Sequence, residues 1–173
     1  LIVLLVLFFS VTLNAQDFWQ QLKGPEGGNV GSLYQGSNDI LYLYSQYCGY
    51  HRSIDDGKNW IRLKTPFVNY HRTYLATNSK DEIFIASSTA GLYRSIDHGQ
   101  HFDLIMNNEN ISRYINGIYI DNKNRIYLIA DFKIYESLDN GFNFKQIFDS
   151  RAYNIQSVYS FHIIDDSTRY IAS

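Results

Sequence analysis

Three eight-residue stretches of this chain share one pattern: Ser53-Ile54-Asp55-Asp56-Gly57-Lys58-Asn59-Trp60, Ser95-Ile96-Asp97-His98-Gly99-Gln100-His101-Phe102 and Ser137-Leu138-Asp139-Asn140-Gly141-Phe142-Asn143-Phe144. Each stretch has a serine, an aspartate two residues later, a glycine two residues after that and an aromatic residue at its end. The serines are 42 residues apart both times. A fixed period of this length indicates stacked copies of one supersecondary unit.

Around each pattern lie four short β-forming runs, separated by turns rich in Asn, Asp, Gly and Ser. The expected strands are residues 30–35, 40–44, 49–52 and 59–63 in the first unit, 74–77, 83–86, 91–94 and 101–105 in the second, and 117–120, 125–130, 133–136 and 143–148 in the third. Residues 155–164 and 169–173 repeat the first two strands of a unit. The composition agrees, because the 15 Tyr and 11 Phe favour strands.

The sequence therefore predicts an all-β protein. A four-stranded antiparallel meander repeated at this period is typical of a β-propeller blade. The chain would hold three blades and half of a fourth, and we expect the native protein to continue beyond residue 173.

The pattern has a mechanical interpretation as a clamp on a hairpin turn. The glycines, Gly57, Gly99 and Gly141, occupy the position where such a turn needs a positive φ. Two residues before the glycine stands an aspartate: Asp55, Asp97 or Asp139. Its carboxylate can accept hydrogen bonds from the amides of the turn. The hydroxyls that can act in the same way belong to Ser53, Ser95 and Ser137. The rings that can be buried in the blade belong to Trp60, Phe102 and Phe144.

This Ser-x-Asp-x-Gly-x-x-Trp/Phe pattern resembles the Asp-box, also called the bacterial neuraminidase repeat, of secreted propellers similar to sortilin and to photosystem assembly factors. The likeness covers residues 17–173. The chain departs from the family at the seventh position, where Asn59, His101 and Asn143 replace the usual Thr. The resemblance implies that the boxes lie on the outer hairpin between the third and fourth strands and have a structural role.

The first 13 residues are apolar except for Ser10 and Thr12. This run predicts the hydrophobic part of a secretory signal peptide, cleaved after Ala15. It is shorter than the ~20 residues that a membrane-spanning helix needs. We therefore expect a signal peptide at residues 1–15, a partial propeller at 16–173, no membrane insertion after the signal is removed, and a secreted, periplasmic or cell-surface location.

Charge and residue types exclude several function classes. The net charge is −2 and no run of Lys or Arg occurs, so nucleic acid is not expected as a partner. Cys48 is the only cysteine, so an internal disulfide is excluded. His98 and His101 fall inside the repeated turn pattern without a third ligand, and we expect neither a metal nor a cofactor.

The segments that lead into the first strand of each later unit combine arginine with tyrosine. Tyrosine offers a ring face to a sugar or peptide, and the guanidinium offers a fork to an acidic group. The candidate ligand-binding residues are Tyr70, His71, Arg72, Arg113, Tyr114, Arg151 and Tyr153. The competing interpretation is that these segments are solvated connectors.

The expected function is non-catalytic binding of a protein or glycan ligand. One alternative is an extracellular glycoside hydrolase, either sialidase-like or xyloglucanase-like. The Arg-Ile/Leu-Pro motif of sialidases is absent, since neither Pro25 nor Pro66 completes it. The other alternative is the sensory ectodomain of a signalling protein. The sequence assigns no catalytic residue.

Overall fold

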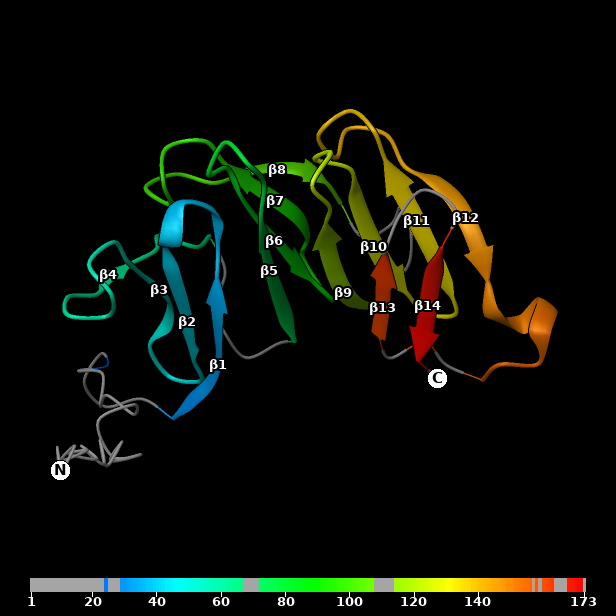
Figure 1. Cartoon of the computed structure of the whole chain (residues 1–173), viewed down its shortest axis with the longest axis horizontal. Coiled ribbons are helices and arrows are strands. Elements are labelled where there is room, and N and C mark those ends of the chain that lie inside the picture. Colours follow the sequence, from blue (N-terminus) through cyan, green and yellow to red (C-terminus); the bar gives the residue numbers. More distant parts are fainter. Residues whose placement is uncertain are drawn as a thin grey trace, which may run out of the picture.

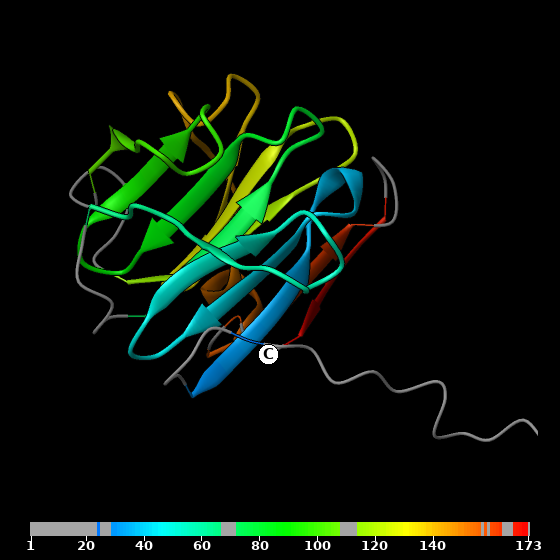
Figure 2. The same ribbon diagram turned by 90° about the vertical axis from the view of Figure 1, so that its left-hand side faces the viewer.

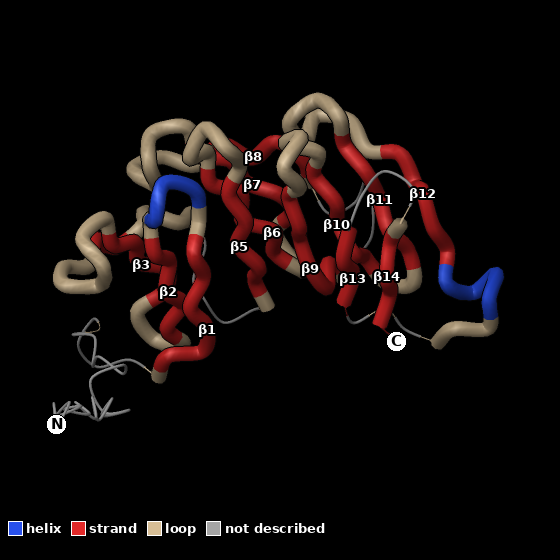
Figure 3. The backbone as a smooth tube through the Cα atoms, viewed as in Figure 1, coloured by secondary structure: helices blue, strands red, loops and turns tan. Residues whose placement is uncertain are grey.

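The protein is seen in a computed structural model that describes residues 24, 29–66, 72–107, 114–156, 158, 160–163 and 168–172. Strands account for most of the regular structure (Figure 3), and two short 3-10 turns, η2 (Ser37–Asp39) and η4 (Ser150–Tyr153), interrupt them. The first sheet contains β1 (Val30–Gln35), β2 (Leu41–Ser45), β3 (Gly49–Ser53) and β4 (Ile61–Arg62).

Two further four-stranded sheets repeat this arrangement. The second contains β5 (Thr73–Thr77), β6 (Ile83–Ser87), β7 (Gly91–Ser95) and β8 (Asp103–Met106), and the third contains β9 (Ile115–Ile120), β10 (Ile126–Ala130), β11 (Lys133–Ser137) and β12 (Lys145–Asp149). A pair, β13 (Ser160–Ile163) and β14 (Arg169–Ala172), follows. Strands pair antiparallel in sequence order within each sheet. The predicted four-stranded meanders are thus confirmed.

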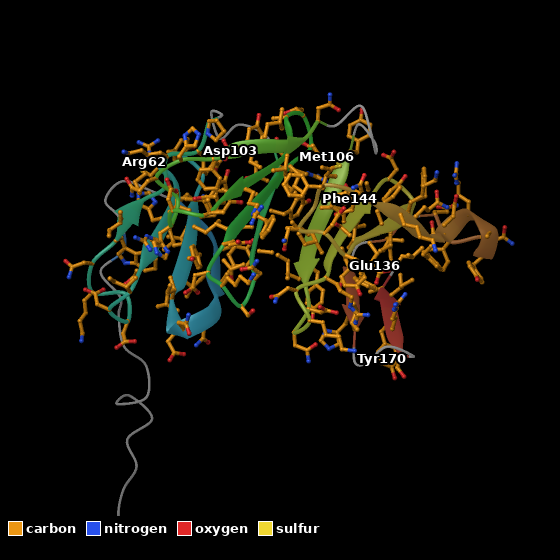
Figure 4. All side chains as sticks on the ribbon, turned by 90° about the horizontal axis from the view of Figure 1, so that it is seen from above. Arg62, Asp103, Met106, Glu136, Phe144 and Tyr170 are labelled. Atoms are coloured by element: carbon orange, nitrogen blue, oxygen red, sulfur yellow. The ribbon has the colours of Figure 1, made fainter. Side chains whose placement is uncertain are left out.

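The sheets follow one another in an arc (Figure 1), and Figure 2 shows the first sheet in front of the later ones. The first strands β1, β5 and β9 lie on the inner side of the arc, while β4, β8 and β12 lie on the outer side. Seen from above, Arg62 of β4 and Asp103 of β8 lie along one margin, and Tyr170 of β14 lies at the opposite margin (Figure 4).

The hydrophobic core lies between the sheets. Phe84, Ala86 and Leu92 of the second sheet form one buried cluster with Ile126 and Leu128 of the third. Similar clusters join the first sheet to the second and the third to the β13–β14 pair. All five residues of β6 and all five of β10 are buried. The second strand of these sheets is covered on both faces. Its sequence is therefore almost continuously apolar and does not alternate between apolar and polar residues.

Each end of the sheets collects a different kind of loop. Because successive strands of a meander run in opposite directions, the first turn and the third hairpin of a sheet lie at the same end. At that end, neighbouring sheets are joined through their first turns: Asn38 Nδ2 donates to Asp81 Oδ2 at 2.6 Å, and Ser79 N donates to Asn124 Oδ1 at 2.9 Å. The second turn of each sheet and the end of its fourth strand lie at the opposite end, called here the connector end.

Most expected strand bounds differ from the observed ones by one or two residues. The expectation of a strand over residues 155–164 is wrong in its first part, because β13 begins only at Ser160. Before it, η4 uses the Asp149 carboxylate as its N-cap and ends at Asn154 in the left-handed conformation. This capped turn satisfies backbone groups locally, so residues 155 and 156 do not enter the sheet.

The expected signal peptide, residues 1–15, lies outside the described residues. Within the described ranges, no helix has the length and apolar character needed to cross a membrane.

Candidate ligand-binding site

The three repeated stretches form hairpins between β3 and β4, β7 and β8, and β11 and β12; residues 53–60, 95–102 and 137–144 are called here the repeat hairpins. In the second one, the buried Ser95 hydroxyl donates to Asp97 Oδ1 at 2.8 Å and accepts from Gly99 N at 2.8 Å. The other two hairpins make the same two bonds, at 2.8 and 2.9 Å. The serine therefore links the strand end to the turn in every copy.

The aspartate of each hairpin holds the residues that follow the glycine. Asp97 Oδ1 accepts from Gln100 N at 3.0 Å and from His101 N at 2.9 Å. In the first and third hairpins an asparagine side chain adds a second bond, from Asn59 Nδ2 to Asp55 Oδ2 at 2.6 Å and from Asn143 Nδ2 to Asp139 Oδ2 at 2.7 Å. These bonds to the ionised form lower the pKa of all three carboxyls, that of Asp55 to about 2.

Each later hairpin also packs on the sheet before it. A Cβ built on Gly99 would lie 2.5 Å from Leu63 Cδ2, and one built on Gly141 would lie 2.7 Å from Ile105 Cδ1. Leu63 and Ile105 are themselves 42 residues apart. Lys64 N also donates to the Gly99 carbonyl at 2.8 Å. Each hairpin is thus closed by its own hydrogen bonds, and the second and third hairpins also pack their sheet against the one before it.

Three of the seven residues expected to bind ligand, Tyr70, His71 and Arg113, lie outside the described residues. The other four, Arg72, Tyr114, Arg151 and Tyr153, are exposed at the connector end. The structure brings the segments of the last three together there. Asp131 N donates to the Tyr114 carbonyl at 2.9 Å, and Ser150 N donates to the Phe132 carbonyl at 2.8 Å.

Arg151 is already engaged within the chain. Its Nε and one terminal nitrogen donate to the two oxygens of Asp149 at 3.0 and 2.7 Å, and its guanidinium lies 5.8 Å from the Phe132 ring centroid. The same bonds lower the pKa of Asp149 to about 2. Tyr153 stacks on Phe148 with centroids 5.3 Å apart and remains 67% exposed. This corner offers an aromatic face to a ligand, whereas its guanidinium is neutralised by Asp149.

The inner strands enclose a groove that the sequence reasoning missed. A hollow of about 400 Å³ opens between β1, β5 and β9, and a neighbouring one of about 230 Å³ extends to β13. Together they form what is called here the inner-strand groove. Its lining residues are Tyr34, Gln35, Gly36, Tyr42, Tyr74, Leu75, Ala76, Thr77, Asn116, Gly117, Ile118, Tyr119, Ile120, Ile129, Ser160 and Phe161.

One repeat position along the groove holds residues of very different size. Tyr34, Ala76 and Tyr119 occupy equivalent places, opposite Tyr42, Phe84 and Tyr127 on their second strands. Alanine in the middle copy lacks the ring that the two flanking copies carry. Aligning the three units at their first strands would have revealed this contrast from sequence.

Tyr42 lines one side of the groove and carries a buried hydroxyl. The side chain is 1% exposed, and its hydroxyl has no hydrogen-bond partner among the described residues. A Cβ on Gly36 would lie 2.7 Å from Tyr42 Cε2, next to the hydroxyl-bearing carbon. Burial raises the Tyr42 pKa to about 12, against a smaller lowering by Arg52. The hydroxyl is therefore protonated throughout the neutral range and can donate.

The described lining contains no acidic, basic or histidine side chain. Glycoside hydrolysis by paired carboxylates requires two acidic side chains that flank the glycosidic bond. Across the described ranges, no group of three or more His, Cys, Asp and Glu side chains is placed to hold a metal ion. His101 instead contacts Asp103 at 3.2 Å, and both side chains are exposed.

Comparison with known proteins supports the fold. No family model and no curated protein sequence matches the chain. Among solved structures, an ancestral GH74 enzyme matches with a TM-score of 0.63 at 21% identity, covering 90% of this chain and 23% of that one. YCF48 from Cyanidioschyzon merolae matches with a TM-score of 0.63 at 15% identity, covering 83% of this chain and 49% of that one. The fold is a β-propeller.

A third match extends this group of propellers. The extracellular domain of a protein described as a one-component system from B. thetaiotaomicron has a TM-score of 0.59 at 14% identity and covers 84% of this chain. The chain spans 20 to 49% of the length of these three structures. Its three four-stranded sheets are blades of the propeller, and the β13–β14 pair contributes the first two strands of a fourth.

Proposed function

We propose that this chain belongs to an exported Asp-box propeller that binds a ligand without altering it chemically. The observation that carries this proposal is the inner-strand groove, which is lined by aromatic, aliphatic and uncharged polar residues and lacks acidic, basic and histidine side chains. A pocket with apolar walls and few polar groups is the usual form of a ligand site. The larger of its two hollows, with a volume of about 400 Å³, is large enough for part of a glycan or peptide.

The matched propellers support binding as a general role. One structure of YCF48 contains a bound D1 peptide, and two other matches are extracellular domains of B. thetaiotaomicron proteins described as a one-component system and a hybrid two-component system. We extend these roles to the present chain as a proposal: residues 1–15 are a signal peptide, residues 16–173 form part of an extracytoplasmic propeller, and the ligand is a protein or glycan.

The connector-end residues complete this proposal as a second contact region. Tyr114 and Tyr153 are 65% and 67% exposed, and the Phe148 ring supports Tyr153 from beneath. Together with Arg72, Tyr70, His71, Arg113 and Arg151, they would contact the parts of a ligand that extend beyond the groove.

A glycoside hydrolase is the second candidate, because GH74 enzymes are among the matched structures. The uncharged lining of the groove weighs against it. A carboxylate pair elsewhere in the full-length protein would favour the glycoside hydrolase candidate again.

The test is to incubate the purified full-length protein with neutral, acidic and sialylated glycans and with peptides. Binding is followed by calorimetry and hydrolysis by the release of reducing ends. We expect saturable binding of one ligand class without product. Tyr119→Ala should weaken that binding, while Phe142→Ala, which truncates an aromatic side chain 59% exposed in the third repeat hairpin, should not. Product formation above that of heat-denatured protein would overturn the non-catalytic proposal.

A further inference from the structure

The gap at Ala76 has the character of a subsite for an uncharged ring. Tyr34 and Tyr119 lie on the strands to either side of it, and both line both hollows of the groove. Their rings combine a flat apolar face with one hydroxyl, which suits ligands that are apolar on one face and polar at the edge. Tyr119 is held from behind by Tyr127 and Phe161, with centroids 6.3 and 6.2 Å away.

Charge decides which ligands can enter. The described lining is neutral, so an ionised ligand would lose hydration without gaining an opposite charge. The polar groups present are amides and hydroxyls, from Gln35, Thr77, Asn116 and Ser160. They can exchange hydrogen bonds with ligand hydroxyls at little desolvation cost.

An unsatisfied group marks the polar side of this subsite. A buried hydroxyl left unpaired is unfavourable, so such groups normally contact water or a ligand. The Tyr42 hydroxyl has no partner among the described residues, and neither do Arg52 Nε and Asp81 Oδ1, whose charges both act on Tyr42. Arg52 and Asp81 carry opposite charges, and neither belongs to the lining of the groove.

We propose that the inner-strand groove binds a neutral oligosaccharide, with a sugar ring placed over Ala76 between Tyr34 and Tyr119 and a sugar hydroxyl accepting a hydrogen bond from Tyr42. This inference rests on the proposed binding function and narrows it to one ligand class. Acidic glycans and peptides are the competing ligands that the test must separate.

The experiment measures the affinity of the full-length protein for cellohexaose, maltohexaose and xylohexaose, with hexagalacturonate and an unstructured peptide as comparisons. We expect at least one neutral hexaose to bind and hexagalacturonate to bind at least ten-fold more weakly. Ala76→Tyr restores the ring that the equivalent positions carry and fills the gap. It should weaken binding at least ten-fold, whereas Ala90→Tyr, in the turn between β6 and β7, should not.

A second variant removes only a hydroxyl group. Tyr42→Phe should weaken neutral-hexaose binding about 3- to 10-fold, the worth of one hydrogen bond. Tyr127→Phe removes a buried hydroxyl that donates to Glu136 at 2.8 Å, outside the groove lining, and should leave binding unchanged. Thermal unfolding of each variant identifies any that fails to fold.

The outcomes separate the two proposals. If no neutral hexaose binds, or if binding is indifferent to both Ala76→Tyr and Tyr42→Phe, the inference is wrong. If a peptide binds instead and Ala76→Tyr abolishes its binding, the groove is a binding site but the ligand class is wrong. If Tyr42→Phe alone has no effect, the hydroxyl contacts ordered water and the direct hydrogen bond is refuted.

Discussion

At the scale of single residues, the serine of each repeat hairpin should contribute more to stability than its exposed neighbours. Ser95 is 1% exposed. Its hydroxyl accepts a hydrogen bond from the backbone amide of Gly99 and donates one to the Asp97 carboxylate. Ile96, the next residue, is 69% exposed. Adjacent positions of one motif therefore differ sharply in what their loss should cost.

Ser95→Ala should lower the free energy of unfolding by about 1–3 kcal/mol, because it leaves the buried Gly99 amide without its acceptor. Ile96→Ala is the matched control and should change stability by less than about 0.5 kcal/mol. Urea denaturation measures both, and ligand affinity per folded molecule should not change in either variant. Equal effects of the two substitutions would show that the hydroxyl is not part of the clamp.

At the scale of elements, the repeat hairpins are acid-sensitive units. Hydrogen bonds from Asn59 and Ser53 hold the pKa of Asp55 at about 2, against 3.8 for an ordinary aspartate. Bonds from His101 and Ser95 lower the pKa of Asp97, and bonds from Asn143 and Ser137 lower that of Asp139. A carboxyl whose pKa is lower in the folded state favours folding only while it is ionised.

The free energy of unfolding should therefore be constant near neutral pH and fall as the pH drops from about 4 to 2, as these carboxyls become protonated. Urea denaturation across this range measures the slope. Asp139→Asn should lower stability at pH 7 and flatten the acid slope. The charge control is Asp56→Asn in the first hairpin, which removes one carboxylate at a position with φ of 57° that asparagine also tolerates and leaves the hydrogen bonds of Asp139 in place.

The strands were predictable because the sequence contains three copies of each one, which can be compared with one another. β1 was expected at its observed bounds, and β7 and β11 each differ by one residue. β13 was misjudged because the 3-10 turn before it depends on the Asp149 cap and on Ser150 Oγ donating to the Ile155 carbonyl at 2.9 Å, which apolar periodicity does not reveal. The inner-strand groove was missed because it depends on which strands face one another across sheets.

At the scale of the whole molecule, the repeat hairpins also join the blades. Gly99 has a φ of 84°, and its α-carbon faces Leu63 of the preceding blade too closely for any side chain. The equivalent glycine of the third blade faces Ile105 in the same way. The glycine of the motif that closes each turn therefore also contacts the preceding blade.

Gly99→Ala should lower the free energy of unfolding by about 2–4 kcal/mol, combining backbone strain at positive φ with overpacking against Leu63. Gly24→Ala, where no heavy atom lies within 4 Å, should have little effect. In a double-mutant cycle with Leu63→Ala, the combined cost should be smaller than the sum of the single costs. Strict additivity would mean that the contact between blades does not contribute.

The central claim is that ligand binds along the inner strands and not on the repeat hairpins. Hydrogen–deuterium exchange of the full-length protein, with and without its tightest-binding oligosaccharide, tests this claim directly. We predict that ligand slows exchange in residues 34–36, 74–77 and 116–120 and leaves the hairpins at 53–60, 95–102 and 137–144 unchanged. Protection confined to the hairpins, with unaltered exchange along β1, β5 and β9, would contradict the account.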